Sequence, residues 1–272
     1  MIVDAFTFYN ELEMLQFRLE LLDRYVDKFI IVEADHTFSG QPKSSTFLEN
    51  RHLFQRYDHK IIHSIAKINT AALSLDKRPD VYSPTDDFWS IEYTQRNHIG
   101  EVLREKQIPG SAIVLLADVD EIPDLDLMRS IKWNPFRRKK IRKDASVLRM
   151  ETYYYNAKKL RTEICQATVL ASCRKMIDET PQALRNGRSE HPVIENGGWH
   201  FSYFMSPDRI ATKIASFSHQ ELNNDKYKDL SRISDRIESG ADLFDRDIGA
   251  SQVPPTKFPA RLRKLLKKHQ WL

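Results

Sequence analysis

An apolar run that ends in three acids constrains the fold of this 272-residue chain more than any other feature. Residues 112–117 read Ala-Ile-Val-Leu-Leu-Ala, and Asp118, Asp120 and Glu121 follow within four positions, before Pro123. So short and apolar a run predicts a strand buried on both faces, and proline, which lacks a backbone N–H, ends it. Burial on both faces is typical of a parallel sheet covered by helices, so the run indicates an α/β protein.

The spacing of the acids predicts a cation site. In an extended chain, Asp118 and Asp120 project to the same side with their Cα atoms roughly 6–7 Å apart. Open α/β sheets bind ligands at the C-terminal ends of their strands. Two carboxylates with water suit Mn²⁺ or Mg²⁺, ions that commonly share their coordination with substrate phosphates. The alternative is an acidic turn after a core strand.

The first half of the chain predicts consecutive βαβ units. We expect strands at 2–8, 29–33, 60–65 and 112–118, and helices at 10–24, 48–57 and 87–108. This order is that of a doubly wound half-domain with right-handed crossovers. Asn10 and Glu13 are expected to cap the first helix reciprocally. Residues 69–86, which include two prolines, predict a loop.

The second half is expected to be β-rich, without helices between its first strands. Strands are expected over 145–150, 152–155 and 167–171, a loop over 196–198 leading into a strand to 204, and helices from Ser206 and over 222–240. This pattern predicts a mixed or antiparallel extension of the sheet. We therefore expect one domain over residues 1–247, followed by a linker and a basic amphipathic tail over 248–272.

Charge and composition bound the partners. The net charge of +4 is uneven, because residues 137–143 hold six Lys/Arg and the tail holds six more without an acid. No nucleic-acid motif accompanies these clusters, so we expect no nucleic-acid partner. Cys165 and Cys173 fit reduced thiols of a cytoplasmic protein, and we see no secretory leader or membrane-spanning run. The tail would either touch an anionic membrane surface or pack as a C-terminal helix.

Four segments together resemble glycosyltransferase family 17, the family of N-acetylglucosaminyltransferase III. They are Asp4–Glu13, Phe29–Glu33, Asp118–Pro123 and Gly198–His200. The resemblance implies a GT-A fold, with a mixed, mainly parallel sheet flanked by helices. It also implies transfer with inversion from a nucleotide sugar, UDP-GlcNAc first, to a glycan or lipid-linked glycan. Because no anchor or stem precedes the motifs, we expect a relative that works outside the Golgi.

The resemblance assigns roles at the donor end of the site. Asp118 and Asp120 would hold the cation against the donor diphosphate, with His200 as a third ligand; a single histidine is otherwise a structural residue. The donor-binding candidates are Phe6, Thr7, Glu33, Lys43, Arg96, Asn97 and Asp118. Core packing is the alternative for Phe6, and a surface charge is the alternative for Arg96.

The acceptor end is assigned in the same way. Trp199 and Tyr203 would stack on an acceptor sugar, or would pack in the core. Asp208 and Glu221 are candidates for the general base that an inverting transfer needs. Acids are also favoured in a first helical turn by the helix dipole, which would explain Asp208 without catalysis. Glu121 would orient a metal-bound water or the sugar, or would be a solvated acid at a turn.

Other classes of function remain to be weighed. An aspartate-nucleophile phosphohydrolase also places two acids after an apolar strand, but it expects small residues and threonine next, where this chain has Glu121-Ile122-Pro123. A nucleic-acid-binding protein would use the basic clusters, and its affinity would depend strongly on salt. A sugar-binding domain without catalysis is the third alternative.

Overall fold

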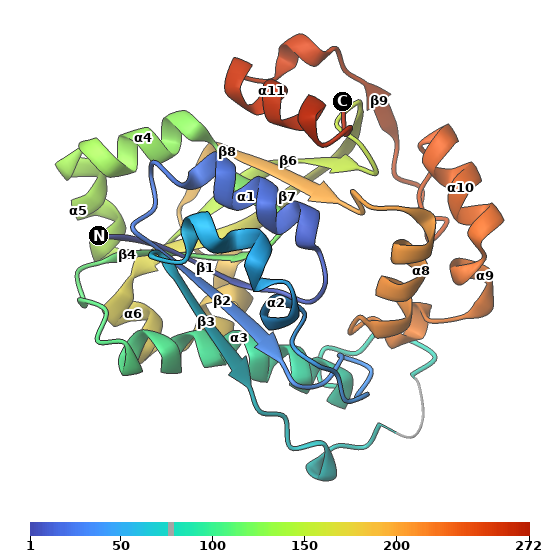
Figure 1. Ribbon diagram of the computed structural model, residues 1–272, viewed down its shortest axis with the longest axis horizontal. Coiled ribbons are helices and arrows are strands. Elements are labelled where there is room, and N and C mark those ends of the chain that lie inside the picture. The colour runs from blue at the N-terminus through green and yellow to red at the C-terminus, as the bar shows by residue number, and fades with distance from the viewer. Residues whose placement is uncertain (76–78) are drawn as a thin grey trace.

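The computed structural model describes residues 1–75 and 79–272, which fold around one mixed sheet flanked by helices (Figure 1). Its strands are β1 (Ile2–Thr7), β2 (Lys28–Ala34), β3 (Ile61–Ala66), β4 (Ile113–Asp118), β5 (Glu121–Pro123), β6 (Ser146–Tyr154), β7 (Lys159–Ser172), β8 (Val193–Ser202) and β9 (Ala250–Gln252). Its α-helices are α1 (Leu12–Leu22), α2 (Thr46–Glu49), α3 (Asp87–Glu105), α4 (Leu125–Trp133), α5 (Pro135–Lys143), α6 (Cys173–Asp178), α7 (Pro181–Asn186), α8 (Pro207–Ser216), α9 (Asp225–Lys228), α10 (Leu230–Ser239) and α11 (Ala260–Lys268). Short 3₁₀ helices span Arg51–Tyr57, Thr70–Ala72, Gly187–Ser189, Gln220–Leu222 and Pro255–Lys257.

The sheet confirms the predicted α/β class and its mixed character. Its order is β3-β2-β1-β4-β7-β6-β8-β5, and β9 pairs with β7 outside this path. The strands β3, β2, β1 and β4 are parallel, whereas β7 is antiparallel to both β4 and β6. The parallel half therefore comes from the βαβ units of the N-terminal sequence. The C-terminal sequence extends it with antiparallel pairs and with the parallel pair β6–β8.

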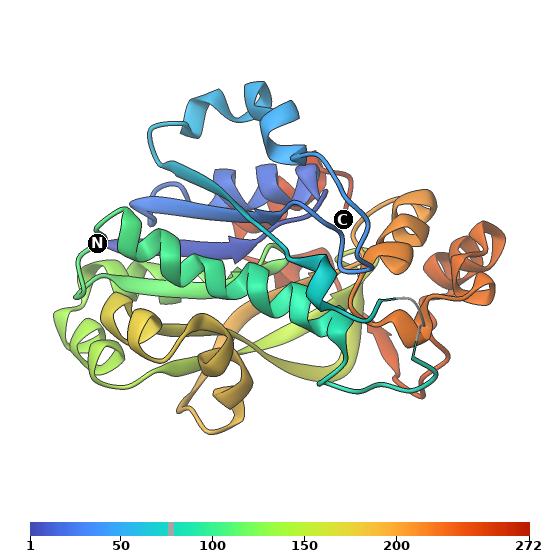
Figure 2. The same ribbon diagram turned by 90° about the horizontal axis from the view of Figure 1, so that it is seen from below.

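The parallel half changes direction at β1, and this change fixes where a ligand can bind. α1 connects β1 to β2 on one side, whereas α3 connects β3 to β4 on the other side of β1. The two helices cover opposite faces, because Ile2 and Phe6 pack in the core with α1 while Val3 and Ala5 pack with α3. Figure 2 shows α3 along one face of these strands. Such a switch point opens a crevice at the C-terminal ends of the diverging strands, here β1 and β4.

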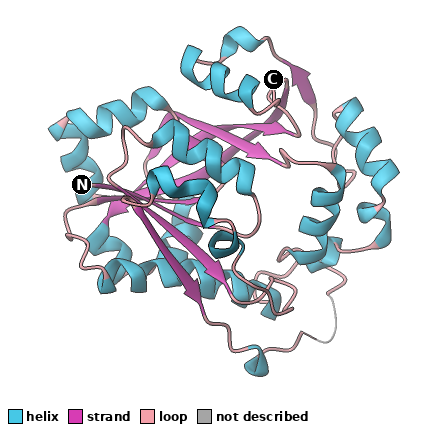
Figure 3. Cartoon of the chain, in the orientation of Figure 1, coloured by secondary structure: helices cyan, strands magenta, loops and turns pink. Residues whose placement is uncertain are grey.

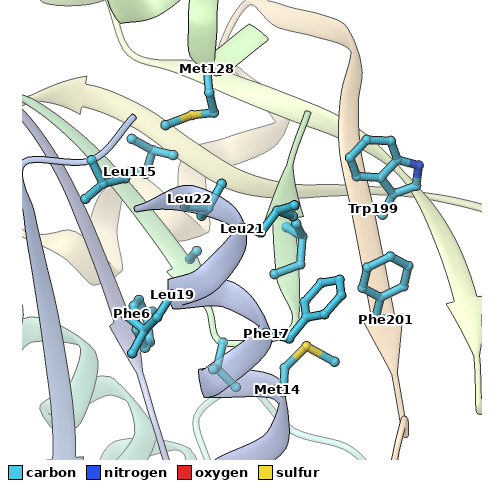
Figure 4. Close-up of a cluster of buried hydrophobic side chains, with 14 of the residues drawn as sticks. Phe6, Met14, Phe17, Leu19, Leu21, Leu22, Leu115, Met128, Trp199 and Phe201 are labelled. Carbon is cyan, nitrogen blue, oxygen red and sulfur yellow. The ribbon is translucent and has the colours of Figure 1, made fainter. Parts of the chain in front are cut away.

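The larger core joins both halves of the sheet. Phe17 of α1 packs edge-on against Phe201 of β8, with ring centroids 5.8 Å apart. Figure 4 shows Trp199 and Phe201 on the same side of β8, facing this cluster. Because side chains alternate along a strand, His200 between them points to the opposite face. Trp199 and Phe201 are therefore core residues, whereas His200 can line a cleft on the other face of the sheet.

The segments expected as strands over 145–150, 152–155 and 167–171 lie in β6 and β7, and the described chain has no helix between these two strands, as expected. The sequence did not predict the helices that flank this pair. α4 and α5 follow β5, and α6 and α7 follow β7, as Figure 3 shows. The basic cluster 137–143 lies on α5, whose N-cap Asn134 accepts hydrogen bonds from the Phe136 and Arg137 N–H groups. α5 buries only Ile141 of its nine residues, so its sequence carries almost no apolar periodicity.

Three local expectations are corrected. Glu11, not Asn10, is the N-cap of α1, and its carboxylate accepts from the Tyr9 and Asn10 N–H groups. The helix expected over 48–57 is a 3₁₀ helix from Arg51 onward, preceded by the single turn α2. The loop expected over 69–86 is interrupted by a 3₁₀ turn, and its residues 76–78 lie outside the described residues.

The tail packs against the body of the protein. Leu262 and Leu266 of α11 are fully buried, and Trp271 packs on Phe17 with ring centroids 5.1 Å apart. Lys268 points outward and pairs with Glu20. The apolar residues of the tail are therefore covered by α1, and they lend no support to membrane docking. Over the described residues, every helix is too short or too polar to cross a bilayer.

Candidate active site

A cleft of about 230 Å³ lies at the C-terminal ends of β1 and β4, where the switch point predicts a ligand. We call it the β1–β4 cleft. Its wall includes Thr7, Glu11, Glu92, Arg96, Asp118, Asp120, His200, Tyr203, Lys213 and His219. Thr7 and Asp118 are register partners at the ends of their two strands. A larger hollow of about 720 Å³ beside α4 and α5 is lined by none of the predicted site residues.

A buried arginine shapes the turn that carries the acids. Arg18 of α1 is fully buried and forms a bidentate pair with Asp4 of β1, at 2.8 and 2.6 Å. Its Nη1 donates to the carbonyl oxygens of Asp118, Val119 and Glu121, at 3.2, 3.2 and 2.6 Å. One guanidinium thus fixes three carbonyls of a four-residue turn, which holds the acidic side chains in a constant orientation.

Asp118 is held by arginines from two different helices. Arg96 of α3 donates to Oδ1 at 3.1 Å, and Arg185 of α7 donates to Oδ2 at 3.0 Å. Thr7 Oγ1 also donates to Oδ1, at 3.2 Å. Burial alone would raise the pKa of Asp118, but the two arginines hold it well below its usual range. The side chain remains 35% exposed, so it faces the cleft as a carboxylate.

Asp120 has looser partners. Its Oδ1 lies 3.7 Å from His200 Nε2, and its Oδ2 lies 3.7 Å from Lys213 Nζ. Both distances are longer than a hydrogen bond, so the Asp120 oxygens can still accept hydrogen bonds or bind an ion. Burial would raise the pKa of Asp120, but Lys213 and His200 lower it. Lys213 is shared with Glu11, at 3.4 Å.

Glu121 is a buried residue that lies behind the wall of the cleft. Its side chain is 3% exposed and forms a bidentate pair with Arg185. It also accepts from Thr168 Oγ1 and from the Asp118 N–H, both at 3.2 Å. Glu121 does not line the β1–β4 cleft. The structure therefore places Glu121 behind Asp118, where it positions Arg185. Glu121 makes no contact with the cleft in which its predicted catalytic role would be performed.

The donor atoms present fit an ion shared with a substrate, not an ion caged by the protein. Over the described ranges, no three His, Cys, Asp or Glu side chains gather closely enough to hold a metal. Asp120 and His200 converge on the cleft and offer two ligands. The oxygens of Asp118 already accept hydrogen bonds from Arg96, Arg185 and Thr7. A diphosphate and water would have to complete the coordination, as is common for Mg²⁺.

The predicted donor-binding residues separate into two groups. Thr7, Arg96 and Asp118 line the β1–β4 cleft, and Lys43 lines a small extension of it. Phe6 is buried in the core beneath the Arg18 guanidinium, 4.7 Å from its ring centroid. Asn97 accepts from the Gln182 N–H on the far side of α3. Glu33 is fully buried and lines neither hollow.

The predicted acceptor and base residues separate likewise. Tyr203 lines the cleft, whereas Trp199 packs in the core with Phe258, at 6.4 Å between centroids. The two glycines before Trp199 do not approach a ligand: a Cβ on Gly198 would lie 2.1 Å from the Ile122 carbonyl oxygen of β5. Asp208 sits in the first turn of α8, where its carboxylate accepts from Ser206 Oγ and lines no part of the cleft.

Glu221 reaches the cleft only through a histidine. Its carboxylate lies 2.7 Å from Nδ1 of His219, and the His219 ring lines the cleft. Trp89 meets this ring edge-on, with centroids 4.8 Å apart. A carboxylate on one ring nitrogen orients an imidazole and leaves the other nitrogen free to accept a proton.

Four residues of the site were missed from the sequence: Arg18, Arg185, Lys213 and His219. Arg18 gave a signal, because it interrupts the leucine face of the helix between Leu15 and Leu19. Arg185, Lys213 and His219 have no such signal in the sequence. They come from polar segments far along the chain and reach the cleft only through the tertiary fold.

The fold is of the GT-A-like class, a mixed α/β sheet flanked by helices, and its switch point brings acids, Arg96 and Lys213 to one cleft. The chain matches the model of glycosyltransferase family 17 over residues 1–247 and belongs to that family. The family confirms the predicted glycosyltransferase class, and with it a sugar donor and an acceptor in general terms.

Two further comparisons add little. No curated protein matches the chain closely enough to count as a relative. A solved structure titled as the inositol-1-phosphate CTP transferase from T. maritima is similar over 99% of this chain and 96% of that chain. Their sequence identity is 6% and the TM-score is 0.39, a likeness too low to carry any argument.

Proposed function

We propose that this glycosyltransferase transfers N-acetylglucosamine from UDP-GlcNAc to a hydroxyl of a glycan or lipid-linked glycan, with inversion. The observation that carries the proposal is the gathering of Asp118, Asp120, Arg96 and Lys213 around one cleft at the switch point. Two carboxylates beside two cations suit a ligand that carries both a diphosphate and hydroxyl groups. Arginine donates bidentately to phosphate oxygens, and hydroxyls donate to carboxylates.

The diphosphate is the leaving group, and its charge must be balanced as the sugar leaves. Arg96 and Lys213 lie in the cleft with side chains 5% and 23% exposed, so ligand contacts with them would be largely shielded from water. A divalent cation, Mn²⁺ or Mg²⁺, would be held by Asp120 and His200 and would add positive charge at the diphosphate. Arg185 keeps Asp118 ionised and fixed for hydrogen bonds to the donor.

The proton of the acceptor hydroxyl needs a base that reaches the cleft. His219 meets this condition, with Glu221 holding its Nδ1. In this assignment Nε2 of His219 accepts the proton, and Glu221 stabilises the imidazolium that results. Glu221 then acts as a positioning residue rather than as the base itself.

Ligand-dependent stabilisation tests the donor. The melting temperature is measured with UDP, UDP-GlcNAc and other nucleotide sugars, with Mn²⁺ or with chelator. A ligand at 100 times its Kd stabilises the native state by about 2.7 kcal/mol, which is roughly 5–10 °C in a chain this size. We expect this shift only with a UDP ligand and metal, and we expect Asp120→Asn to abolish it. Asp126→Asn, at an acid that is 83% exposed on α4, is the matched control. No shift with any nucleotide would refute the donor assignment.

Matched substitutions test the base. His219→Asn should reduce transfer by about 10²–10⁴-fold while the UDP-GlcNAc-induced shift stays as in the wild type. Asp208→Asn should leave the rate unchanged, because its carboxylate lies outside the cleft. The opposite result, a silent His219 and an essential Asp208, would return the role of base to the α8 terminus.

A further inference from the structure

A second cavity, of about 290 Å³, adjoins the β1–β4 cleft. It lies over β6, β7 and β8 and beneath the segment 217–246. The two hollows share the wall residues His200, Ser202, Tyr203, Phe217 and His219. A ligand in the second cavity would therefore meet the donor along the wall that holds His219.

Three buried polar groups of this cavity make no hydrogen bond to any described residue. They are Oγ1 of Thr152, Oη of Tyr154 and Nη1 of Arg161. The three residues are only 7%, 3% and 4% exposed. Native proteins rarely leave buried donors unpaired, because the hydrogen bonds lost from water are then not replaced. Since all three come from the neighbouring strands β6 and β7, one ligand could satisfy them together.

The charges around these groups are balanced. Arg161 Nη2 donates to Asp242 Oδ2 at 2.7 Å, and Arg246 Nη2 donates to the same oxygen at 2.9 Å. Glu163 supplies a second carboxylate to the wall, so two arginines face two acids. The Arg161 guanidinium also lies over the Tyr154 ring, 4.6 Å from its centroid, which fixes that ring. His200, which also lines this cavity, lies 3.7 Å from the Asp120 carboxylate, so it too has an acid as its partner. The cavity thus offers directed hydrogen bonds from groups whose charges are balanced.

We infer that the second cavity binds an uncharged, hydroxyl-rich sugar unit of the acceptor. Thr152, Tyr154 and Arg161 are the residues that recognise its hydroxyl groups. Phe217 and Phe244 line the same cavity and give the sugar's C–H face an apolar surface. The assignment as the acceptor site rests on the proposed function, because it is the shared wall with the donor cleft that makes this sugar the acceptor.

Binding of simple glycosides tests the inference. The probes are the methyl glycosides of glucose, galactose, mannose and N-acetylglucosamine, with methyl glucuronide as a charged comparison. Affinity is measured by saturation-transfer NMR titration, with and without UDP. We expect at least one neutral probe to bind the wild type better than the glucuronide. Tyr154→Phe and Thr152→Val should each weaken that binding roughly three- to tenfold, the value of one hydrogen bond.

Tyr155→Phe is the matched control. The Tyr155 hydroxyl donates to the Ala241 carbonyl oxygen at 3.0 Å and lies outside the second cavity. Tyr155→Phe should lower the melting temperature by about 2 °C and leave glycoside binding intact. Tyr154→Phe should weaken binding without lowering the melting temperature, because its hydroxyl has no partner to lose.

The outcomes separate the two proposals. Failure of every neutral glycoside to bind the wild type, equal effects of the two tyrosine substitutions, or preference for the glucuronide would each overturn the inference. UDP-dependent stabilisation of the same samples reports on the donor separately. If the donor assignment fails but Tyr154-dependent glycoside binding persists, the sugar site stands without its role as the acceptor site.

Discussion

The ends of β2 and β4 make an informative comparison, because each of these parallel strands has an acid at or next to its last residue. Glu33 at the end of β2 accepts hydrogen bonds from Lys43 and Ser45, from the N–H groups of Thr46 and Phe47, and pairs with His63. Its side chain is completely buried. Asp118 at the end of β4 is also held by cations, yet it is a third exposed and faces a cleft.

The difference shows that an acid at a strand end marks a site only when its partners leave it accessible. Residues 43–47, which lead into the first turn of α2, lie over Glu33 and donate to both of its oxygens, so this acid anchors the start of α2 to the sheet. At β4, Arg96 of α3 and Arg185 of α7 hold Asp118 but leave it a third exposed to the cleft, and the next acid, Asp120, has only long contacts. We therefore expect substitutions at the β2 end to affect stability and those at the β4 end to affect ligand binding.

The largest expected effect is that of Arg18→Met, because Arg18 supports the turn on which the β4 end depends. The substitution leaves Asp4 buried without a partner and should lower the free energy of unfolding by about 3–5 kcal/mol, measured by urea denaturation. The double substitution Asp4→Leu with Arg18→Met should recover most of this stability but not UDP binding, because the turn carbonyls still lack their donor. If Arg18→Met lowered the free energy of unfolding by less than about 1 kcal/mol, the turn would keep its conformation without Arg18.

Glu33→Gln comes next. The amide keeps the shape of the side chain but cannot accept from Lys43 and the two N–H groups as a carboxylate does. We expect a loss of about 2–3 kcal/mol, the range for hydrogen bonds to a charged group. UDP binding per folded molecule should stay near the wild-type value. If UDP binding were lost while the protein remained folded, the distinction between the two strand ends would fail.

The stability difference between wild type and Glu33→Gln should also depend on pH. Burial opposes ionisation of Glu33, but His63, Ser45 and Lys43 together lower its pKa below the ordinary value of 4.5. A lowered pKa gives stability that is complete above pH 4.5 and is lost as the pH falls through the folded value. Urea denaturation from pH 7 to 3 should show a constant gap between the two proteins above about pH 5.5. The gap should narrow below pH 4.5, and one that widens instead would contradict the assigned sign.

Asp120→Asn should have the smallest effect on stability, about 1 kcal/mol, because the amide fills the same space and the carboxylate has no hydrogen bond shorter than 3.5 Å to lose. Its contacts with His200 and Lys213 are both 3.7 Å long, and Lys213 retains Glu11 when Asp120 is neutralised. Thermal melting without ligand measures this difference. A loss as large as that of Glu33→Gln would mean that Asp120 is a structural acid too.

The sequence predicted the part of the site that local pattern controls. The acid-tipped strand, the βαβ order and the start of α8 at Pro207 were all visible, because apolar runs and capping residues act over a few positions. The helices α4 and α5 were missed although Asp124 and Asn134-Pro135 begin them in the usual way, because the charge of α5 hides its single buried residue, Ile141.

The residues that complete the site come from parts of the chain that are far apart in the sequence. Arg185 lies 67 positions from Asp118, and Lys213 lies 93 positions from Asp120; only the crossing of α7 and α8 over the strand ends brings them together. Glu33 illustrates the opposite difficulty. The family resemblance assigned it to the donor site, and only the fold shows that residues 43–47, at the start of α2, cover it.

The most direct measurement is the rate of UDP release from UDP-GlcNAc with Mn²⁺, compared among wild type, Glu33→Gln and Asp120→Asn at equal folded concentration. If the β4 end is the donor site, Asp120→Asn should be slower by about 100-fold or more, and Glu33→Gln should stay within about threefold of wild type. The opposite order, with Asp120→Asn active and Glu33→Gln inactive, would place the chemistry at the end of β2 and contradict the assignment of the β1–β4 cleft.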